Sequence, residues 1–298
     1  MAYHVPVMLS KCIEALEVSK GGIFVDVTFG GGGHSKAILD SLPNGHLYAF
    51  DQDAEAQANS IHDDRFTLIQ QNFKYLKNYL TLYKAIPVAG ILADLGVSSH
   101  QFDEAQRGFS TRFDGPLDMR MDAGKGQTAA ELLSTIELQE LTDILRNYGE
   151  LHNAYKSAQA LIAYRQEKPL LTTQNLKEAL KANAPRGREN KYFAQVFQAI
   201  RIELNQELDT LKMMLQQSLQ LLKPGGRLVV MSYHSLEDRL VKNFMRSGNF
   251  EGKIEKDFFG KHLVPFKLIS RKPILADEEE LAANPRARSA KLRIAEKL

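Results

Sequence analysis

The stretch IFVDVTFGGGGHSKAILD, residues 23–40, places four consecutive glycines between two different hydrophobic patterns. Residues 23–27 are mostly apolar and rich in valine and isoleucine, which predicts a buried strand. From Ser35 onward the apolar spacing is that of a helix beginning there. An ordinary strand-to-helix turn needs only one or two glycines, and each further glycine costs conformational entropy. The run therefore predicts that a ligand approaches the backbone closely at this turn.

Apolar runs alternate with helical patterns on both sides of this stretch. Such alternation is typical of βαβ units and predicts an α/β fold with a parallel sheet. The four early runs are 23–27, 46–50, 66–70 and 88–95, and the late ones are 226–234, 262–270 and 290–298. The segment KPGGRLVV, before a late strand, suits a sheet that closes with an antiparallel hairpin.

Strand patterns disappear between about 105 and 190, and helical spacing takes their place. Two pairs have the spacing of a capping box that opens a helix: Thr128 with Glu131, and Ser134 with Glu137. A longer helical pattern runs from about 193 to 222 and ends at Lys-Pro-Gly-Gly. The sequence thus predicts a sheet domain made of 1–104 and 201–298, interrupted by a helical insertion at 105–200 that recognises the substrate.

Composition limits the class of protein. The chain has 298 residues, of which 44% are hydrophobic and 25% charged, with a formal net charge of +2. Its single cysteine, Cys12, excludes an internal disulfide framework and a cysteine-based zinc cluster, and we predict no metal site. Neither a signal peptide nor a membrane span is recognisable, so we expect a cytoplasmic protein with no membrane partner.

The glycine run matches the dinucleotide fingerprint G-x-G-x-x-G poorly. Gly30 and Gly32 occupy its first two places, but the third falls on Ser35; one residue later, the third falls on Lys36. This mismatch favours S-adenosyl-L-methionine over NAD. An NAD-dependent oxidoreductase remains the rival class, and preferential binding of NADH would identify it.

Polar and aromatic side chains follow the next three strands at the edge of the sheet where ligands bind. Asp51 ends the second strand about 20 residues after the loop, where it can accept hydrogen bonds from both hydroxyls of an adenosine ribose. Phe73 follows the third strand and could stack on an adenine. Asp94 ends the fourth strand. Together these positions predict a site for a purine nucleoside.

Seven blocks spread along the chain resemble the signatures of the bacterial RsmH (MraW) family. They are FVDVTFGGGGHS, FDQD, ADLGVSS, RGFS, DGPLDMRMD, SYHSLEDR and NPRARSAKLRIAEK. The resemblance implies a class I methyltransferase fold with a helical insertion. It also implies S-adenosylmethionine-dependent methylation of the N4 amine of a cytidine in the decoding centre of 16S rRNA, presented on the small ribosomal subunit. The cofactor contacts implied by motif are Gly32, Gly33, His34, Asp51, Phe73, Asp94 and Gln101.

The chemistry of an exocyclic amine directs attention to the end of the fourth strand. The lone pair of the amine is delocalised into the ring, so fixed acceptors for its hydrogens would assist methyl transfer. Asp94 and Ser98 are the candidate catalytic residues there. Methylation at cytosine C5 needs a cysteine nucleophile, and Cys12 lies in a helical pattern typical of a packed residue. Another nucleic-acid amine as the target, a non-catalytic RNA-binding assembly factor and a homodimer remain open.

Overall fold

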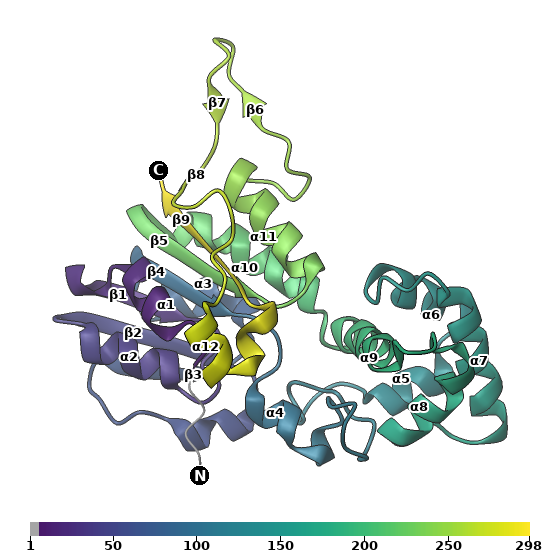
Figure 1. Ribbon diagram of the computed structural model, residues 1–298. Coiled ribbons are helices and arrows are strands. Elements are labelled where there is room, and N and C mark those ends of the chain that lie inside the picture. The colour runs from purple at the N-terminus through teal and green to yellow at the C-terminus, as the bar shows by residue number, and fades with distance from the viewer. Residues whose placement is uncertain (1–5) are drawn as a thin grey trace. The chain divides into compact units, whose positions relative to one another are not determined.

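The computed structural model describes residues 6–298, which form two compact units (Figure 1). The first unit combines the chain up to Gly96 with Leu208–Leu298, and the second is Val97–Glu207. The helical stretch expected at 105–200 falls within the second unit. Within residues 6–298, no helix is both long and apolar enough to cross a membrane.

A seven-stranded sheet with the strand order β3-β2-β1-β4-β5-β9-β8 forms the centre of the first unit. Neighbours among β1 to β5 are parallel, whereas β9 is antiparallel to both β5 and β8. The strands are β1 (Gly22–Asp26), β2 (Gly45–Asp51), β3 (Phe66–Gln70), β4 (Val88–Asp94), β5 (Leu222–Ser232), β8 (Phe266–Leu268) and β9 (Lys291–Lys297). The chain runs outward from β1 to β3 and returns at β4, so the strand order reverses between β1 and β4. Ligands bind at such a reversal in open α/β sheets.

Side chains alternate between the two faces of this sheet, and each face has its own helix layer. The helices of this unit are α1 (Leu9–Leu16), α2 (Gly33–Ser41), α3 (Leu76–Leu82), α10 (Glu207–Leu221), α11 (Ser235–Ser247) and α12 (Glu278–Ala283). Val25 of β1 packs in the hydrophobic cluster that includes residues of α3, α10 and α11, whereas the adjacent Phe24 packs in the cluster that includes residues of α1 and α2. Because the strands are buried on both faces, their sequences are continuous apolar runs. The expected α/β fold of class I methyltransferases, with its antiparallel closing strands, is confirmed.

The second unit is helical and has a separate hydrophobic core. Its helices are α4 (Ser99–Asp103), α5 (Ala129–Thr135), α6 (Leu138–Asn147), α7 (Ala154–Glu167), α8 (Thr173–Leu180) and α9 (Glu189–Asn205). The capping box of Thr128 and Glu131 at the start of α5 is confirmed. The one predicted for Ser134 and Glu137 is wrong, because Ser134 lies inside α5 and its hydroxyl donates to the carbonyl of Glu131.

Two other predicted elements are divided in the structure. The single helix expected over 193–222 is interrupted at Gln206, whose φ of 51° is incompatible with a continuous helix. The strand expected over 262–270 becomes β7 (His262–Leu263), which pairs with β6 (Glu255–Lys256) in a separate hairpin, and β8 in the main sheet. Pro265 separates the two pieces, and proline has no amide hydrogen for a sheet.

Candidate functional site

The four glycines between β1 and α2 have different reasons to lack a side chain. Gly30 and Gly32 have positive φ values of 52° and 76°, and a Cβ on Gly32 would lie 2.9 Å from the ring of Phe29. A Cβ on Gly33 would collide with Pro6. At Gly31, by contrast, no described residue other than its two chain neighbours has an atom within 4 Å of the Cβ position. Neighbouring residues thus restrict the loop at Gly32 and Gly33, whereas among residues 6–298 nothing contacts the Cβ position of Gly31, as a ligand cradle requires.

A buried carboxylate at the end of β1 supports this loop. Asp26 accepts hydrogen bonds from Ser35 Oγ on α2 at 2.7 Å and from the amide of Thr28 at 3.0 Å. Burial raises the pKa of Asp26 above its ordinary value. The hydroxyl of Thr28 accepts in turn from the amide of Asp94 at 2.7 Å. Asp26 therefore connects the ends of β1 and β4 and the start of α2. The sequence analysis missed it, although a carboxylate within an apolar strand is itself a signal because its burial needs compensation.

Asp51, at the end of β2, holds the first glycine of the loop. Its Oδ2 accepts from the amide of Gly30 at 2.7 Å and its Oδ1 accepts from the amide of Asp53 at 2.9 Å. Burial raises the pKa of Asp51 to about 6, against the lowering effect of these two hydrogen bonds. Each oxygen keeps a further lone pair for a ligand hydroxyl. Asp53 is itself buried and caps the short helix at Ala54–Asn59.

Asp94, at the end of β4, lies between a tyrosine and a histidine. Its Oδ1 accepts from the hydroxyl of Tyr233 at 2.7 Å, and its Oδ2 lies 3.8 Å from Nδ1 of His34. The Nε2 of His34 lies 3.1 Å from the carbonyl of Val7, and this nitrogen must donate because a carbonyl can only accept. Burial raises the pKa of Asp94 to about 6, with His34 and Tyr233 acting in the opposite direction. The structure therefore brings the predicted residues His34 and Asp94 together.

Tyr233 is the second residue of this site that the sequence analysis missed. It directly follows β5, and its ring lies against Gly96, where an added Cβ would be 3.6 Å from the tyrosine Cδ2. Burial and the nearby carboxylate of Asp94 raise the pKa of Tyr233, so the phenol is a donor at neutral pH. The rule that ligand residues follow parallel strands would have found it, had it been applied to the fifth strand as well as to the first four.

Phe73 begins the short helix after β3, in the first unit. Its ring is partly buried against the cluster of the α3 face. The turn before it is ordered by Asn72, whose Nδ2 donates to Oε1 of Gln52 at 2.7 Å and so connects the ends of β3 and β2. An adenine contact by Phe73 stays a prediction.

Ser98 and Gln101 belong to the second unit, where they form the capping box of α4. Ser98 Oγ accepts from the amide of Gln101 at 3.1 Å, and Oε1 of Gln101 accepts from the amide of Ser98 at 3.1 Å. Both side chains thus have a structural role at this helix start, and Gln101 is buried. Their predicted roles, a catalytic one for Ser98 and cofactor binding for Gln101, remain predictions.

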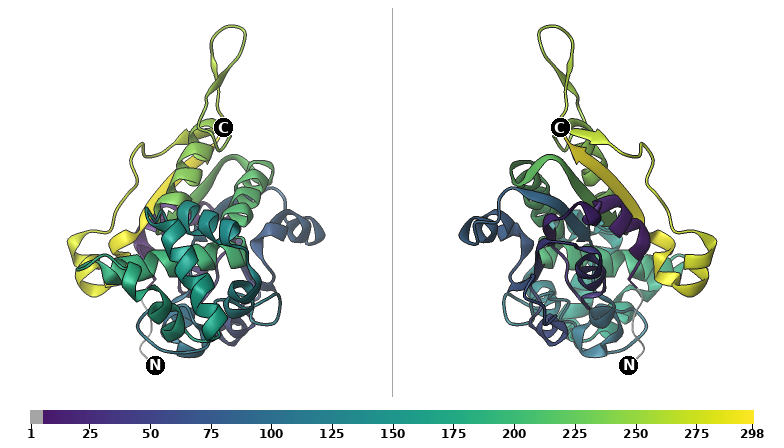
Figure 2. Two further views of the ribbon diagram at one scale, coloured as in Figure 1. Left: turned by 90° about the vertical axis from the view of Figure 1, so that its right-hand side faces the viewer. Right: turned by 90° about the vertical axis from the view of Figure 1, so that its left-hand side faces the viewer.

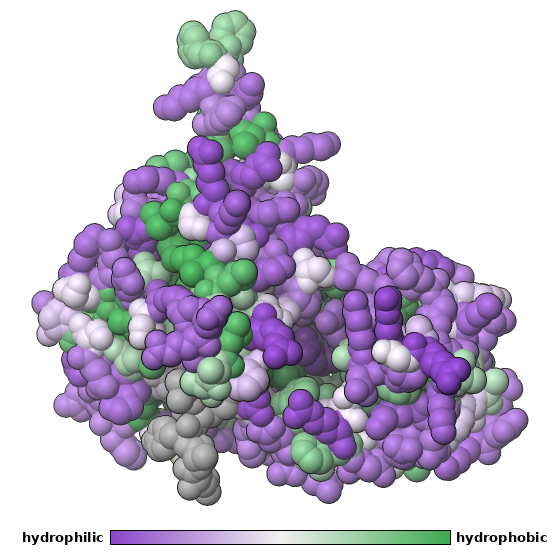
Figure 3. All heavy atoms as spheres, in the orientation of Figure 1, coloured by the Kyte–Doolittle hydropathy of each residue, from purple (hydrophilic) through white to green (hydrophobic). Residues whose placement is uncertain are grey.

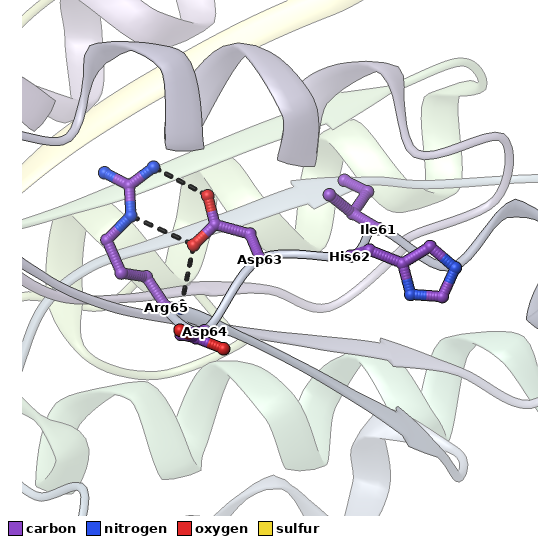
Figure 4. Close-up of a pocket in the computed structure, with 5 residues that line it drawn as sticks. All are labelled: Ile61, His62, Asp63, Asp64 and Arg65. Carbon is purple, nitrogen blue, oxygen red and sulfur yellow. Dashed lines mark hydrogen bonds and ion pairs between the residues drawn. The ribbon is translucent and has the colours of Figure 1, made fainter.

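A shallow hollow before β3 is lined by Ile61, His62, Asp63, Asp64 and Arg65 (Figure 4). The carboxylate of Asp63 accepts from Arg65 Nε at 3.0 Å and Nη2 at 2.7 Å. Arg65 Nη1 donates to the carbonyl of Leu42 at 2.7 Å. The charged groups of Asp63 and Arg65 are therefore already paired, and this hollow offers less to a ligand than the strand ends.

The raised pKa values predict that this site destabilises the fold at neutral pH. A carboxyl group in the unfolded chain has a pKa near 4, so between about pH 4 and pH 6 the folded chain holds more protons at Asp94. Stability therefore falls as pH rises through this window, by about 3 kcal/mol for this group, since one pKa unit corresponds to about 1.4 kcal/mol. In melting experiments, Asp94→Asn should gain stability over the unmodified protein, and the gain should be larger at pH 8 than at pH 4.

Asp63→Asn is a control in which the expected change in stability has the opposite sign. Arg65 holds the pKa of Asp63 below its ordinary value, so removing this charge should lower the melting temperature at pH 8 or leave it unchanged. An equal change in stability for Asp94→Asn at both pH values would show that burial does not raise the pKa of Asp94.

Comparison with known proteins gives consistent matches over the whole chain. A family model described as the MraW methylase family matches residues 1–298. Relatives named ribosomal RNA small subunit methyltransferase H include one from Phocaeicola vulgatus, 54% identical over 296 residues, which cover 99% of this chain and 97% of the relative. Another, from Flavobacterium johnsoniae, is 55% identical over 299 residues, covering 100% of this chain and 99% of the relative.

Similar solved structures include an rRNA methylase from Streptococcus thermophilus, with a TM-score of 0.43 and 13% identity, covering 97% of this chain and 93% of that one. A Streptococcus mutans protein in complex with S-adenosylhomocysteine has a TM-score of 0.46 and 14% identity, covering 99% and 100%. The membership is shown by the family model and by the close relatives, and it confirms the resemblance of the seven sequence blocks. The chain belongs to the MraW methylase family.

Proposed function

We propose that the protein methylates the exocyclic N4 amine of a cytidine in the decoding centre of 16S rRNA, on the small ribosomal subunit in the cytoplasm. The proposal depends on sequence similarity. More than half of the residues are identical, over nearly the whole chain, to those of relatives named ribosomal RNA small subunit methyltransferase H. The cofactor is S-adenosyl-L-methionine. The helical second unit is proposed to recognise the RNA.

The state of the only cysteine supports an amine rather than a ring carbon as the target. Cys12 is fully buried in α1, and burial raises the pKa of its thiol. Methylation at C5 requires a thiolate that reaches the base. A buried, protonated thiol cannot provide this, whereas methylation of an amine requires no covalent intermediate.

The residues at the strand ends fit the proposed cofactor. Among the described residues, nothing lies within 4 Å of the Cβ position of Gly31, and each oxygen of the Asp51 carboxylate keeps a further lone pair for a ligand. When bound, S-adenosylmethionine supplies a methyl group on a positively charged sulfur. The target amine gains the methyl group and must lose a proton. We assign the acceptance of that proton to Asp94: its carboxylate accepts a hydrogen bond from Tyr233, and its pKa of about 6 makes it a stronger base than an ordinary carboxylate.

Tyr233→Phe should shift the pH dependence of methyl transfer. The phenol donates to the ionised form of Asp94, so its loss makes that form less stable and raises the pKa of Asp94. Because a hydrogen bond to a charged group contributes about 1.5–3 kcal/mol, the acid limb of the rate profile should move up by about one to two pH units. The measurement is the single-turnover rate from pH 5 to pH 9 at saturating cofactor.

If the acid limb is unchanged and the rate is lower at every pH, Tyr233 has only a structural role and does not influence the pKa of Asp94. Tyr79→Phe, on α3, is the matched control: it removes the same phenol hydroxyl from a tyrosine other than the one that donates to Asp94, and it should leave the profile unchanged.

Mass spectrometry of 16S rRNA from cells with and without the gene tests the target directly. We expect one N4-methylated cytidine in the decoding centre to lose its methyl group when the gene is absent. Loss of methylation at an adenine or guanine amine would identify a different target. No change in any methylated nucleotide, with purified protein inactive on unmodified subunits, would favour a non-catalytic assembly factor.

A further inference from the structure

Two phenylalanines at the tip of the β6–β7 hairpin are almost completely exposed. Phe258 is 98% exposed and Phe259 is 91% exposed. Their rings contact one another edge to face, with centroids 5.7 Å apart. Both views of Figure 2 show the hairpin extending away from the sheet of the first unit, and Figure 3 shows a hydrophobic tip on a mostly hydrophilic stalk. Neither ring packs in a core, so folding does not explain them.

The backbone at this tip is ordered by its own hydrogen bonds. Asp257 Oδ1 accepts from the amides of Phe259 at 2.9 Å and Lys261 at 2.8 Å, and the amide of Asp257 donates to the carbonyl of Lys261 at 2.9 Å. Lys256 pairs with His262 in the hairpin ladder. The two rings are thus presented by a closed turn, and the carboxylate of Asp257 is engaged within it.

The hairpin and the chain that follows it are strongly basic. Residues 253–272 contain six lysines and arginines and only two acidic residues, although the net charge of the whole chain is only +2. Lys253, Lys256 and Lys261 are exposed on the hairpin itself. Exposed aromatic rings beside lysines are the combination that binds single-stranded nucleic acid, because bases stack on the rings while the cations contact phosphates.

We propose that the β6–β7 hairpin is an RNA-binding element, on which unpaired bases of the substrate RNA stack against Phe258 and Phe259 and phosphates contact the neighbouring lysines. This inference rests on the proposed function for its choice of RNA as the partner, and it assigns the hairpin a role in substrate binding apart from the strand ends. A protein partner would need apolar surface beyond two rings, and the hairpin stalk carries charged side chains instead.

Binding of cofactor-free protein to small ribosomal subunits lacking the modification tests the inference without any need for methyl transfer. The double variant Phe258→Ala/Phe259→Ala should bind the subunits about tenfold or more weakly, since each stacked base contributes substantially to affinity. Its melting temperature and its affinity for S-adenosylmethionine should not change, because both rings are exposed. Leu82→Ala, which truncates a 71% exposed side chain at the end of α3, is the matched control and should bind normally.

A photo-crosslinking amino acid placed at Phe258 identifies the partner. Crosslinks to 16S rRNA are expected, whereas crosslinks only to ribosomal proteins would overturn the proposal. Binding to vesicles of anionic lipid that is lost in the double variant would assign the tip to a membrane surface. A dimer in solution that dissociates in the double variant would assign it to a second copy of the chain. If the unmodified protein binds subunits through the hairpin but methylates nothing, the proposed function fails while the inference stands.

Discussion

Asp94→Asn is expected to lower the single-turnover rate of methyl transfer by about a hundredfold to ten-thousandfold, the range supplied by a positioned base. The amide can still accept a hydrogen bond from Tyr233, but it cannot take a proton from the methylated amine. The neutral side chain keeps the shape of the carboxylate, so the fold should persist. Rates are measured at saturating S-adenosylmethionine and saturating subunits, so that weaker cofactor binding does not enter the result.

Asp40→Asn on α2 is the control for the chemical change, because Asp40 is exposed and pairs with Lys36 at 3.2 Å. It should react at the normal rate. A nearly normal rate for Asp94→Asn would show that Asp94 does not act as the base in methyl transfer. Cofactor binding would then be its remaining predicted role. The same variant also provides the stability comparison at pH 4 and pH 8, so the two roles of the carboxylate are separated in one protein.

Asp51→Ala is expected to weaken S-adenosylmethionine binding by about one to two orders of magnitude. The loss of even one hydrogen bond from a ribose hydroxyl to a carboxylate costs about 1.5–3 kcal/mol, and 1.4 kcal/mol corresponds to about tenfold. The structure adds a second cause, because the variant also loses the contact that holds the amide of Gly30. Isothermal titration with S-adenosylmethionine and S-adenosylhomocysteine measures the loss.

Asp51→Asn should lose less affinity, because it retains one acceptor oxygen. Asp53→Ala separates the ribose contact from the local fold. It removes the cap of the helix at Ala54–Asn59, so we expect a lower melting temperature, by about 1 kcal/mol of stability, with nearly normal cofactor affinity. A greater loss of affinity at Asp53 than at Asp51 would mean that the ribose is held by the other carboxylate.

Local sequence patterns were sufficient to predict the strands of the sheet and some residues of the candidate site. The early apolar runs become β1 to β4, and the glycine run becomes the β1–α2 loop, because strand periodicity and turn chemistry act over a few residues. The positions after parallel strands identified Asp51 and Asp94, since every parallel strand delivers its carboxyl end to the same edge. The same reasoning failed for the helix over 193–222, where one left-handed residue, Gln206, interrupts a continuous helical pattern.

What the sequence determined by itself is therefore the family, the presence of the early parallel strands and the prediction that a ligand binds at their carboxyl ends, whereas their order in the sheet came from the structure. Only the tertiary structure decided which side chains share hydrogen bonds. Tyr233 and Asp94 are 139 residues apart and meet because β5 pairs with β4. Asp26 supports the loop from within the core, since it is 1% exposed and its oxygens accept from Ser35 and Thr28. The exposure of Phe258 and Phe259 is likewise visible only in three dimensions, since an apolar pair in sequence resembles core until its neighbours are known.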